Sequence, residues 1–334
     1  MDPPLDAPNP FRGARGESHA AGLSQINNAH VVGVCDLVPE LLENFKVNWG
    51  QRWPNANTYT NYREMIDKEN LDILTIATPD DKHTDIAVYA AMHGVKGIFC
   101  EKPIATSIED ADKILEACEQ NGVVISVDYS RRWQPIYHTV RELIQGGEIG
   151  IVKTIITIMG GQRAMLFRNG SHLIDLMCFY AESEPSQVSA HLEEGFEDWD
   201  RYKGDGGRLP ENDPSGNGLV IFNNGIRGIY QSDKCSFLRH QLLIIGSDGE
   251  INVDLAGPTA EVVTKAKSSD QVSRTQVRTN QYHSQGFQAC YEELIDLVEN
   301  GGTGVSSGKE ARKTVQIMTG FLESNQDDSR LLNL

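Results

Sequence analysis

A charged pair followed by proline ends an apolar run in the stretch FCEKPIA, residues 99–105. Ligands of an open parallel sheet bind beyond the carboxyl ends of its strands, so Lys102 at such an end would be placed for chemistry. An ordinary strand end explains the same residues, because surface charge is common there and Pro103 has no N–H for a β-ladder. The place of Glu101, Lys102 and Pro103 in the fold therefore decides between the two interpretations.

A second chemical signal lies in residues 11–36, FRGARGESHAAGLSQINNAHVVGVCD. Gly13 and Gly16, which flank Arg15, occupy the second and third glycine positions of a dinucleotide-binding loop, and Asp36 follows Gly16 by twenty residues. A carboxylate there accepts hydrogen bonds from the ribose hydroxyls and repels a 2′-phosphate, so the pattern favours NAD over NADP. A glycine-containing turn before an alanine-rich helix is the alternative.

The beginning of this loop departs from the fingerprint. Phe11 stands where the first glycine belongs, and PPLDAPNP, residues 3–10, stands where an apolar strand belongs. Proline-dense sequence cannot form a central strand, and the first glycine permits a tight turn that phenylalanine does not favour. We therefore expect the first strand to be missing or replaced, with a consequence for cofactor affinity.

The elements between residues 30 and 150 alternate between apolar strands and helices. Valine- and isoleucine-rich runs of this kind are typical of a doubly wound parallel sheet covered on both faces. The predicted strands are 30–35, 71–78, 97–100 and 123–127, and the predicted helices are 39–49, 81–94, one that begins after Ser107, and 135–145.

After residue 150 the pattern predicts a large, mainly antiparallel open sheet, with hairpin turns at NNG and SDG. The predicted strands are 154–159, 188–192, 218–232 as a hairpin, 241–253 and 260–265, and the predicted helices are 171–181, 286–299 and 308–323. Residues 194–216 are predicted to be a surface loop. The expected organisation is an atypical segment over 1–11, an NAD(P)-binding domain over 12–130, and an α/β substrate and oligomerisation domain over 131–334 whose C-terminal helices pack back.

Composition excludes several classes of protein. The net charge of −17 and the lack of a basic stripe argue against nucleic acid as a partner. No apolar run is long enough to span a bilayer, and the acidic, proline-rich start is not a secretory signal. The six cysteines contain no C-x-x-C pair, which predicts reduced thiols in the cytoplasm and no structural metal.

Several motifs together resemble the glucose–fructose oxidoreductase/inositol dehydrogenase (Gfo/Idh/MocA) family. They are GARGESHA, GVCD, IATPDDKH, CEKPIA, SHLIDL and a C-terminal helix before LLNL, and the resemblance covers roughly residues 12–334. It implies a Rossmann domain that binds NAD(P), followed by an α/β domain whose open sheet forms the substrate site and the contacts of a homodimer or homotetramer.

The resemblance also assigns catalytic roles. Lys102 would lie beside the nicotinamide and donate a hydrogen bond to the substrate hydroxyl, with a cis bond before Pro103 and with Glu101 pairing with the lysine or orienting its neighbours. His172 matches the histidine of the family's D-x-x-x-H pattern. Near a helix N-terminus it would be a neutral base that takes the alcohol proton, or else a histidine that satisfies a helix end.

Other positions follow from the same resemblance. Thr78, Pro79 and His83 fall where the family contacts its cofactor, together with Glu101, Lys102 and Pro103. Tyr129 and Arg131 follow a strand and are expected to line the substrate cleft. Asp175, one helical turn beyond His172, either orients that histidine or is an ordinary carboxylate of the helix surface.

The family pattern places an aspartate four residues before the histidine, where this chain has Arg168. An arginine cannot carry a proton at neutral pH. Either Arg168 binds an anionic substrate group, or the site has drifted from efficient redox chemistry.

The leading functional interpretation is an NAD(P)-dependent oxidoreductase of carbohydrate metabolism. It would act on a secondary alcohol or ketone of a sugar, cyclitol or related polyol. The alternatives are a non-catalytic cofactor- or sugar-binding paralogue, whose activity the missing strand and the arginine have impaired, and a glycoside hydrolase that uses NAD transiently.

Overall fold

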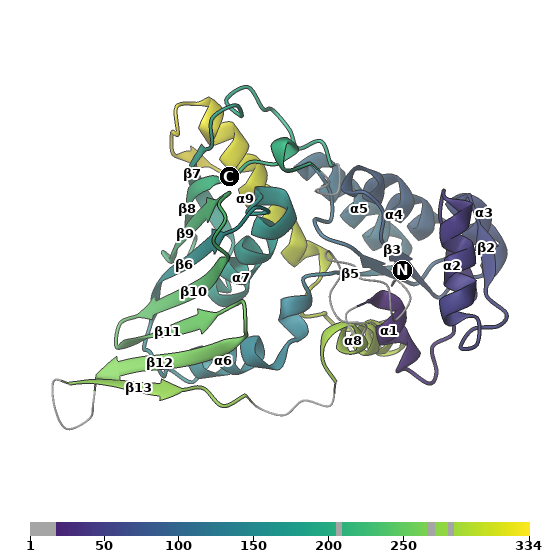
Figure 1. Ribbon diagram of the computed structural model, residues 1–334, viewed down its shortest axis with the longest axis horizontal. Helices are drawn as coiled ribbons and strands as arrows, with labels where there is room; N and C mark the ends of the chain where they lie inside the picture. The colour runs from purple at the N-terminus through teal and green to yellow at the C-terminus, as the bar shows by residue number, and fades with distance from the viewer. Residues whose placement is uncertain (1–17, 205–208, 266–270, 280–283) are drawn as a thin grey trace.

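The computed structural model describes residues 18–204, 209–265, 271–279 and 284–334. Its first part contains two parallel sheets with helices packed around them (Figure 1). One sheet joins β1 (Gly33–Cys35) to β2 (Asn57–Tyr59), and the other has the order β3 (Ile73–Ile76), β4 (Gly97–Cys100), β5 (Val124–Val127). The helices of this part are α1 (His19–Ser24), α2 (Pro39–Trp49), α3 (Tyr62–Glu69), α4 (His83–Met92) and α5 (Ile108–Asn121).

The two parallel sheets are separate within the described residues. In a doubly wound sheet the first strand lies between its second and fourth strands, which correspond here to β1 and β3. In the described part of the chain, no strand pairs with the second edge of β1 or of β3. Phe11 and the loop residues Gly13, Arg15 and Gly16 lie outside the described residues.

The second part is built on one nine-stranded sheet. Its order is β13-β12-β11-β10-β6-β9-β8-β7-β14, and all neighbours pair antiparallel except β6 and β9. The bounds are β6 (Val152–Gly160), β7 (Pro185–Leu192), β8 (Gly216–Phe222), β9 (Arg227–Asp233), β10 (Arg239–Gly246), β11 (Gly249–Asp254), β12 (Thr259–Lys265), β13 (Val272–Gln276) and β14 (Leu332–Asn333). Helices α6 (Pro135–Gln145), α7 (Ser171–Ala181) and α9 (Gly308–Gln326) lie on one side of it (Figure 1).

The C-terminal part of the chain returns to the parallel sheet. Helix α8 (Gly286–Asn300) packs on α1, β4 and β5, while α9 packs on β7 and α7 and also reaches α5. The backbone N–H of Val127 donates to the carbonyl of Ser306 at 2.9 Å, and the Ser306 hydroxyl donates to the carbonyl of Val127 at 2.8 Å. These two hydrogen bonds tie the carboxyl end of β5, where the candidate site lies, to the segment between α8 and α9.

The predicted fold class is confirmed, and three predicted helices match the observed bounds 39–49, 135–145 and 171–181. The Ser107 side chain caps α5 by accepting from the N–H of Asp110. The sequence analysis missed β2, α3, β13 and β14, which are short or mostly polar. Among the described residues, no helix is long and apolar enough to cross a membrane.

Candidate active site

Lys102 lies at the carboxyl end of β4, in the turn that the sequence singled out. The bond between Lys102 and Pro103 is cis, as the resemblance implied. The side chain is 5% exposed, and its ammonium group donates a hydrogen bond to the backbone carbonyl of Arg168. The lysine therefore points from the parallel sheet toward the turn before α7.

That turn brings His172 close to Lys102. It consists of η3 (Leu166–Gly170), and the Asp213 carboxylate holds it by accepting from the N–H groups of Phe167 and Arg168, both at 2.9 Å. His172 follows in the first turn of α7. The two predicted catalytic residues are thus gathered from segments 70 residues apart through one short backbone segment.

The electrostatics of the pair suit proton chemistry near neutral pH. Burial, followed by the charge of Arg168, lowers the pKa of Lys102 to about 8. Burial and the charges of Arg131, Lys102 and Arg168 lower the pKa of His172 well below its ordinary value. His172 is therefore a neutral imidazole at pH 7, and its Nδ1 has no hydrogen-bond partner within the described part of the chain.

Glu101 belongs to a second cluster on the other side of Lys102. The Nε2 atom of His19 lies 3.2 Å from the Glu101 carboxylate, and the Nδ1 atom of His19 lies 2.9 Å from the Tyr291 hydroxyl. Burial raises the pKa of Glu101, but the hydrogen bond with His19 and the charges of His19, Lys102 and Arg168 outweigh this and lower that pKa to about 2. Glu101 is therefore an anion that helps keep Lys102 protonated.

Asp128, after β5, completes this cluster. Burial and the nearby Glu101 raise the pKa of Asp128 well above its ordinary value, so it holds a proton beside the glutamate. Ligand atoms of His19, Glu101 and Asp128 lie within 4.8 Å of one another, close enough to hold a metal ion. The positive charges of Lys102 and Arg168 nearby disfavour such an ion and favour a carboxyl pair that shares a proton.

The predicted cofactor residues lie at the carboxyl ends of β1 and β3. Asp36 directly follows β1, and its Oδ1 accepts from the N–H of Val38 at 2.9 Å; its other carboxylate oxygen has no partner among the described residues and is free for a ribose hydroxyl. Thr78 and Pro79 follow β3 in the loop before η1 (Asp80–Lys82). Asp36 therefore offers a free acceptor at the sheet edge where an open parallel sheet binds its ligands.

His83 and Tyr129 support the site from inside the protein. His83 is fully buried, and its ring nitrogens lie 2.9 Å from the carbonyl of Pro103 and 3.1 Å from that of Thr78. His83 therefore connects the loop after β3 to the loop after β4, and its ring is not exposed to solvent. Tyr129, predicted to line the cleft, is also fully buried and packs edge-on against the His172 ring at 5.9 Å. Of the two predicted cleft residues, only Arg131 is partly exposed.

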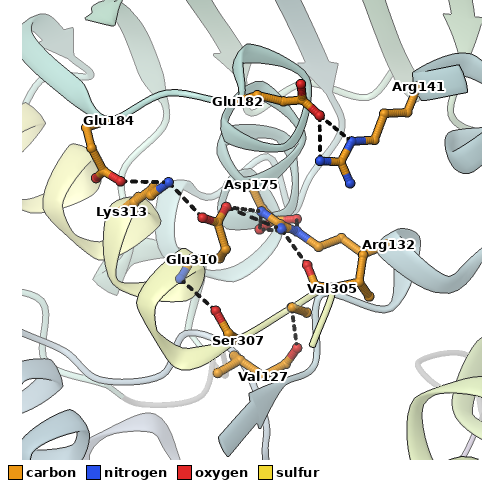
Figure 2. A network of polar contacts seen from close by, with 11 residues as sticks. Val127, Arg132, Arg141, Asp175, Glu182, Glu184, Val305, Ser307, Glu310 and Lys313 are labelled. Carbon is orange, nitrogen blue, oxygen red and sulfur yellow. Dashed lines mark hydrogen bonds and ion pairs between the residues drawn. The ribbon is translucent and has the colours of Figure 1, made fainter. Parts of the chain in front are cut away.

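A buried ion-pair network fixes α7 beneath His172 (Figure 2). Arg132 donates from Nε to both oxygens of Asp175 at 3.0 Å, and its Nη1 donates to the carbonyl of Val305 at 2.7 Å. Glu310 of α9 lies 3.5 Å from the same guanidinium. Asp175 is therefore a buried partner of Arg132 and not a carboxylate of the helix surface, and whether it orients His172 stays a prediction.

The sequence analysis missed three acidic residues and a tyrosine at this site. Besides Asp128 and Asp213, they are Asp80 and Tyr202, whose hydroxyl donates to Asp80 at 2.8 Å while its ring stacks on Phe167 at 4.1 Å. Asp80 follows the IATP stretch and could have been selected with it. Tyr202 and Asp213 come from the loop after β7, and nothing local in the sequence marks them.

The parallel sheets and their helices form a Rossmann-like domain of the kind that binds NAD(P). Residues 12–129 match the family model described as "Oxidoreductase family, NAD-binding Rossmann fold". The match covers about a third of the chain and agrees with the Gfo/Idh/MocA motifs, so the chain is similar to that family over its Rossmann region.

Two characterised relatives match the N-terminal part. Inositol 2-dehydrogenase of Salmonella typhimurium is 29% identical over 144 residues, 41% of this chain and 40% of that protein. D-apiose dehydrogenase of Paraburkholderia graminis is 30% identical over 177 residues, 48% of this chain and 46% of that protein. The chain thus matches less than half the length of these relatives.

Solved structures match over nearly the whole chain. Aldose-aldose oxidoreductase from Caulobacter crescentus has a TM-score of 0.79 at 19% identity, covering 93% of this chain and 94% of that one. Levoglucosan dehydrogenase in complex with NADH and levoglucosan has a TM-score of 0.76 at 18% identity, covering 94% and 95%. At these identities the comparison shows that the fold is shared.

Proposed function

We propose that the protein is an NAD-dependent oxidoreductase that acts on a secondary alcohol or ketone of a sugar, cyclitol or related polyol. The observation that carries the proposal is the meeting of Lys102 and His172 at the carboxyl ends of the parallel strands. Relatives that match its N-terminal part act on inositol and D-apiose by their names, which supports the substrate class.

The residues divide the work between binding and proton transfer. NAD, when bound, supplies the hydride acceptor. Lys102 donates a hydrogen bond to the substrate oxygen and orients the carbinol, while the neutral His172 accepts the hydroxyl proton. Asp36, Thr78 and Pro79 hold the cofactor, because they lie where an open sheet binds its ligands.

The proposal is tested by absorbance at the reduced-nicotinamide band while NAD and a panel of polyols and sugars are offered. We expect a substrate-dependent rise, and a larger signal with NAD than with NADP because Asp36 repels a 2′-phosphate. A parallel titration of the cofactor by nicotinamide fluorescence separates a non-catalytic binding protein from an enzyme. Failure of NAD and NADH to bind would overturn the proposal.

A further inference from the structure

Within the described residues, the Arg168 side chain has no protein partner, although the backbone N–H and carbonyl of this residue both form hydrogen bonds. The N–H of Arg168 donates to Asp213, and its carbonyl accepts from Lys102 and, at 3.2 Å, from the Ser171 hydroxyl. The guanidinium makes no hydrogen bond or ion pair with any residue in the described ranges, and the residue is only partly exposed. Arg132, by contrast, is fully engaged with Asp175 and Val305.

The charge of this guanidinium acts on the reacting groups. It lowers the pKa of Lys102 and of His172, and the Lys102 ammonium group donates to the backbone carbonyl of the same arginine. Arg131 also lowers the pKa of His172, and it forms no ion pair with a carboxylate in the described part of the chain. Two guanidinium groups thus add positive charge near His172, in a protein whose net charge is −17.

The neighbouring carboxyl groups form their hydrogen bonds with groups other than the Arg168 guanidinium. Glu101 is engaged by His19, Asp80 accepts from Tyr202, and Asp213 accepts from two backbone N–H groups. Burial raises the pKa of Asp128 and favours its neutral form. The charges of Glu101 and Asp80 act on Arg168 from a distance, but within the described part of the chain its guanidinium N–H groups stay free to donate to a ligand.

We propose that the substrate carries an anionic oxygen group, a carboxylate or a phosphate, which the guanidinium of Arg168 binds while Lys102 and His172 act on a nearby hydroxyl. This rests on the proposed function and narrows it from polyols and sugars to their acids or phosphate esters. The planar guanidinium forms two parallel hydrogen bonds with such a group, and an aspartate at this position would repel it. The arginine thus explains why the family's acid is absent here.

The test compares binding and turnover of charged and neutral ligands. Calorimetry measures the affinity of D-gluconate, D-galacturonate and D-glucose 6-phosphate against D-glucose and myo-inositol, with and without NADH, in the full chain and in Arg168→Gln. We expect the acids or the phosphate to bind more tightly than the neutral compounds. Arg168→Gln should weaken their binding roughly 10- to 100-fold, as for a lost charge-assisted hydrogen bond, and raise KM more than it lowers kcat.

Three further variants sharpen the test. Arg168→Lys keeps the positive charge but lacks the planar guanidinium, so it should recover part of the anion affinity that Arg168→Gln loses. Arg168→Asp should reverse the preference toward neutral sugars. Arg330→Gln, at a guanidinium whose side chain is 74% exposed, should change nothing. Equal affinity for charged and neutral ligands, or unchanged anion binding in Arg168→Gln, would overturn the inference. Because anion binding is measured without cofactor as well, its failure is distinguishable from a failure to bind or reduce NAD.

Discussion

At the scale of single residues, the protonation state of Lys102 is set by opposing neighbours. Burial and Arg168 lower its pKa to about 8, while Glu101, Asp80 and Asp128 act in the other direction. The amine is therefore a cation at neutral pH that loses its proton under mildly basic conditions. An amine whose pKa lies near the working pH suits a donor that hydrogen-bonds to the developing alkoxide oxygen of the substrate.

Replacing Lys102 tests this role directly. We expect kcat/KM of the wild-type enzyme to be level between about pH 6 and 8, because His172 stays neutral there, and to fall above about pH 8 as Lys102 deprotonates. Lys102→Arg should remove that basic limb, since a guanidinium keeps its proton, and Lys102→Met should lower kcat about 10²- to 10⁴-fold. Initial rates across the pH range check both. A wild-type rate that rises through pH 8 would show instead that the neutral amine is the base.

At the scale of elements, the ion pair between Arg132 and Asp175 holds α7 in the orientation that presents His172. Both side chains are almost fully buried, so removal of one leaves an uncompensated charge. We expect Arg132→Met to lower the free energy of unfolding by about 3–5 kcal/mol, and the double variant Arg132→Met/Asp175→Leu to recover most of it. Urea denaturation measures both values.

An exposed ion pair provides the matched control for this change. Lys68 and Glu64 lie 2.7 Å apart on α3, with side chains 61% and 48% exposed, so Lys68→Met should leave the free energy of unfolding almost unchanged. A double variant no more stable than Arg132→Met alone would show that the pair itself is not what stabilises α7.

Within the described residues, β1 and β3 each have one edge without a paired strand, which leads to a prediction about the first strand. A variant with valines in place of Pro3, Pro4, Pro8 and Pro10, and with Phe11→Gly, supplies both the strand and the missing glycine. We expect this variant to bind NADH more tightly and to unfold at a higher temperature. Nicotinamide fluorescence and a thermal melt measure the two effects, and the valine replacements without Phe11→Gly are the control. Equal NADH affinity in all three proteins would contradict the assigned place of the loop.

The sequence predicted the elements whose own residues specify them. The helix at 39–49 begins with proline, and that at 108–121 has a serine cap and a Gly122 at its end, so both are set locally. Lys102 and His172 could be proposed from the sequence because the motif around each is local as well. Asp213 and Tyr202 act on the site only through long-range contacts, and the burial that shifts the pKa of Asp128 depends on helices far along the chain. Neither effect leaves a pattern within one segment.

At the scale of the whole molecule, the nine-stranded sheet has helices on one side only, as Figure 1 shows. Along the strands of this sheet, residues on the helix-covered side alternate with residues on the other side. Several of the residues on that other side are apolar. Ile229 is 40% exposed, and Ile156, Ile158, Leu243 and Ile245 are partly exposed on the neighbouring strands β6 and β10. In the described residues nothing covers this face, and apolar faces of this kind mark protein–protein contacts.

A second copy of the chain is the partner that we expect on this face, because two such sheets can pack on each other through a symmetric contact. Ile229→Lys places a charge in the middle of the face and should shift a dimer or tetramer toward the monomer, as measured by analytical ultracentrifugation. Val47→Lys is the control, since that side chain is 80% exposed on α2 and lies outside the large sheet. A wild-type protein that sediments as a monomer at all concentrations would contradict the prediction. Because Lys102 and His172 lie on the helix-covered side of the sheet, the Ile229→Lys monomer should still bind NADH.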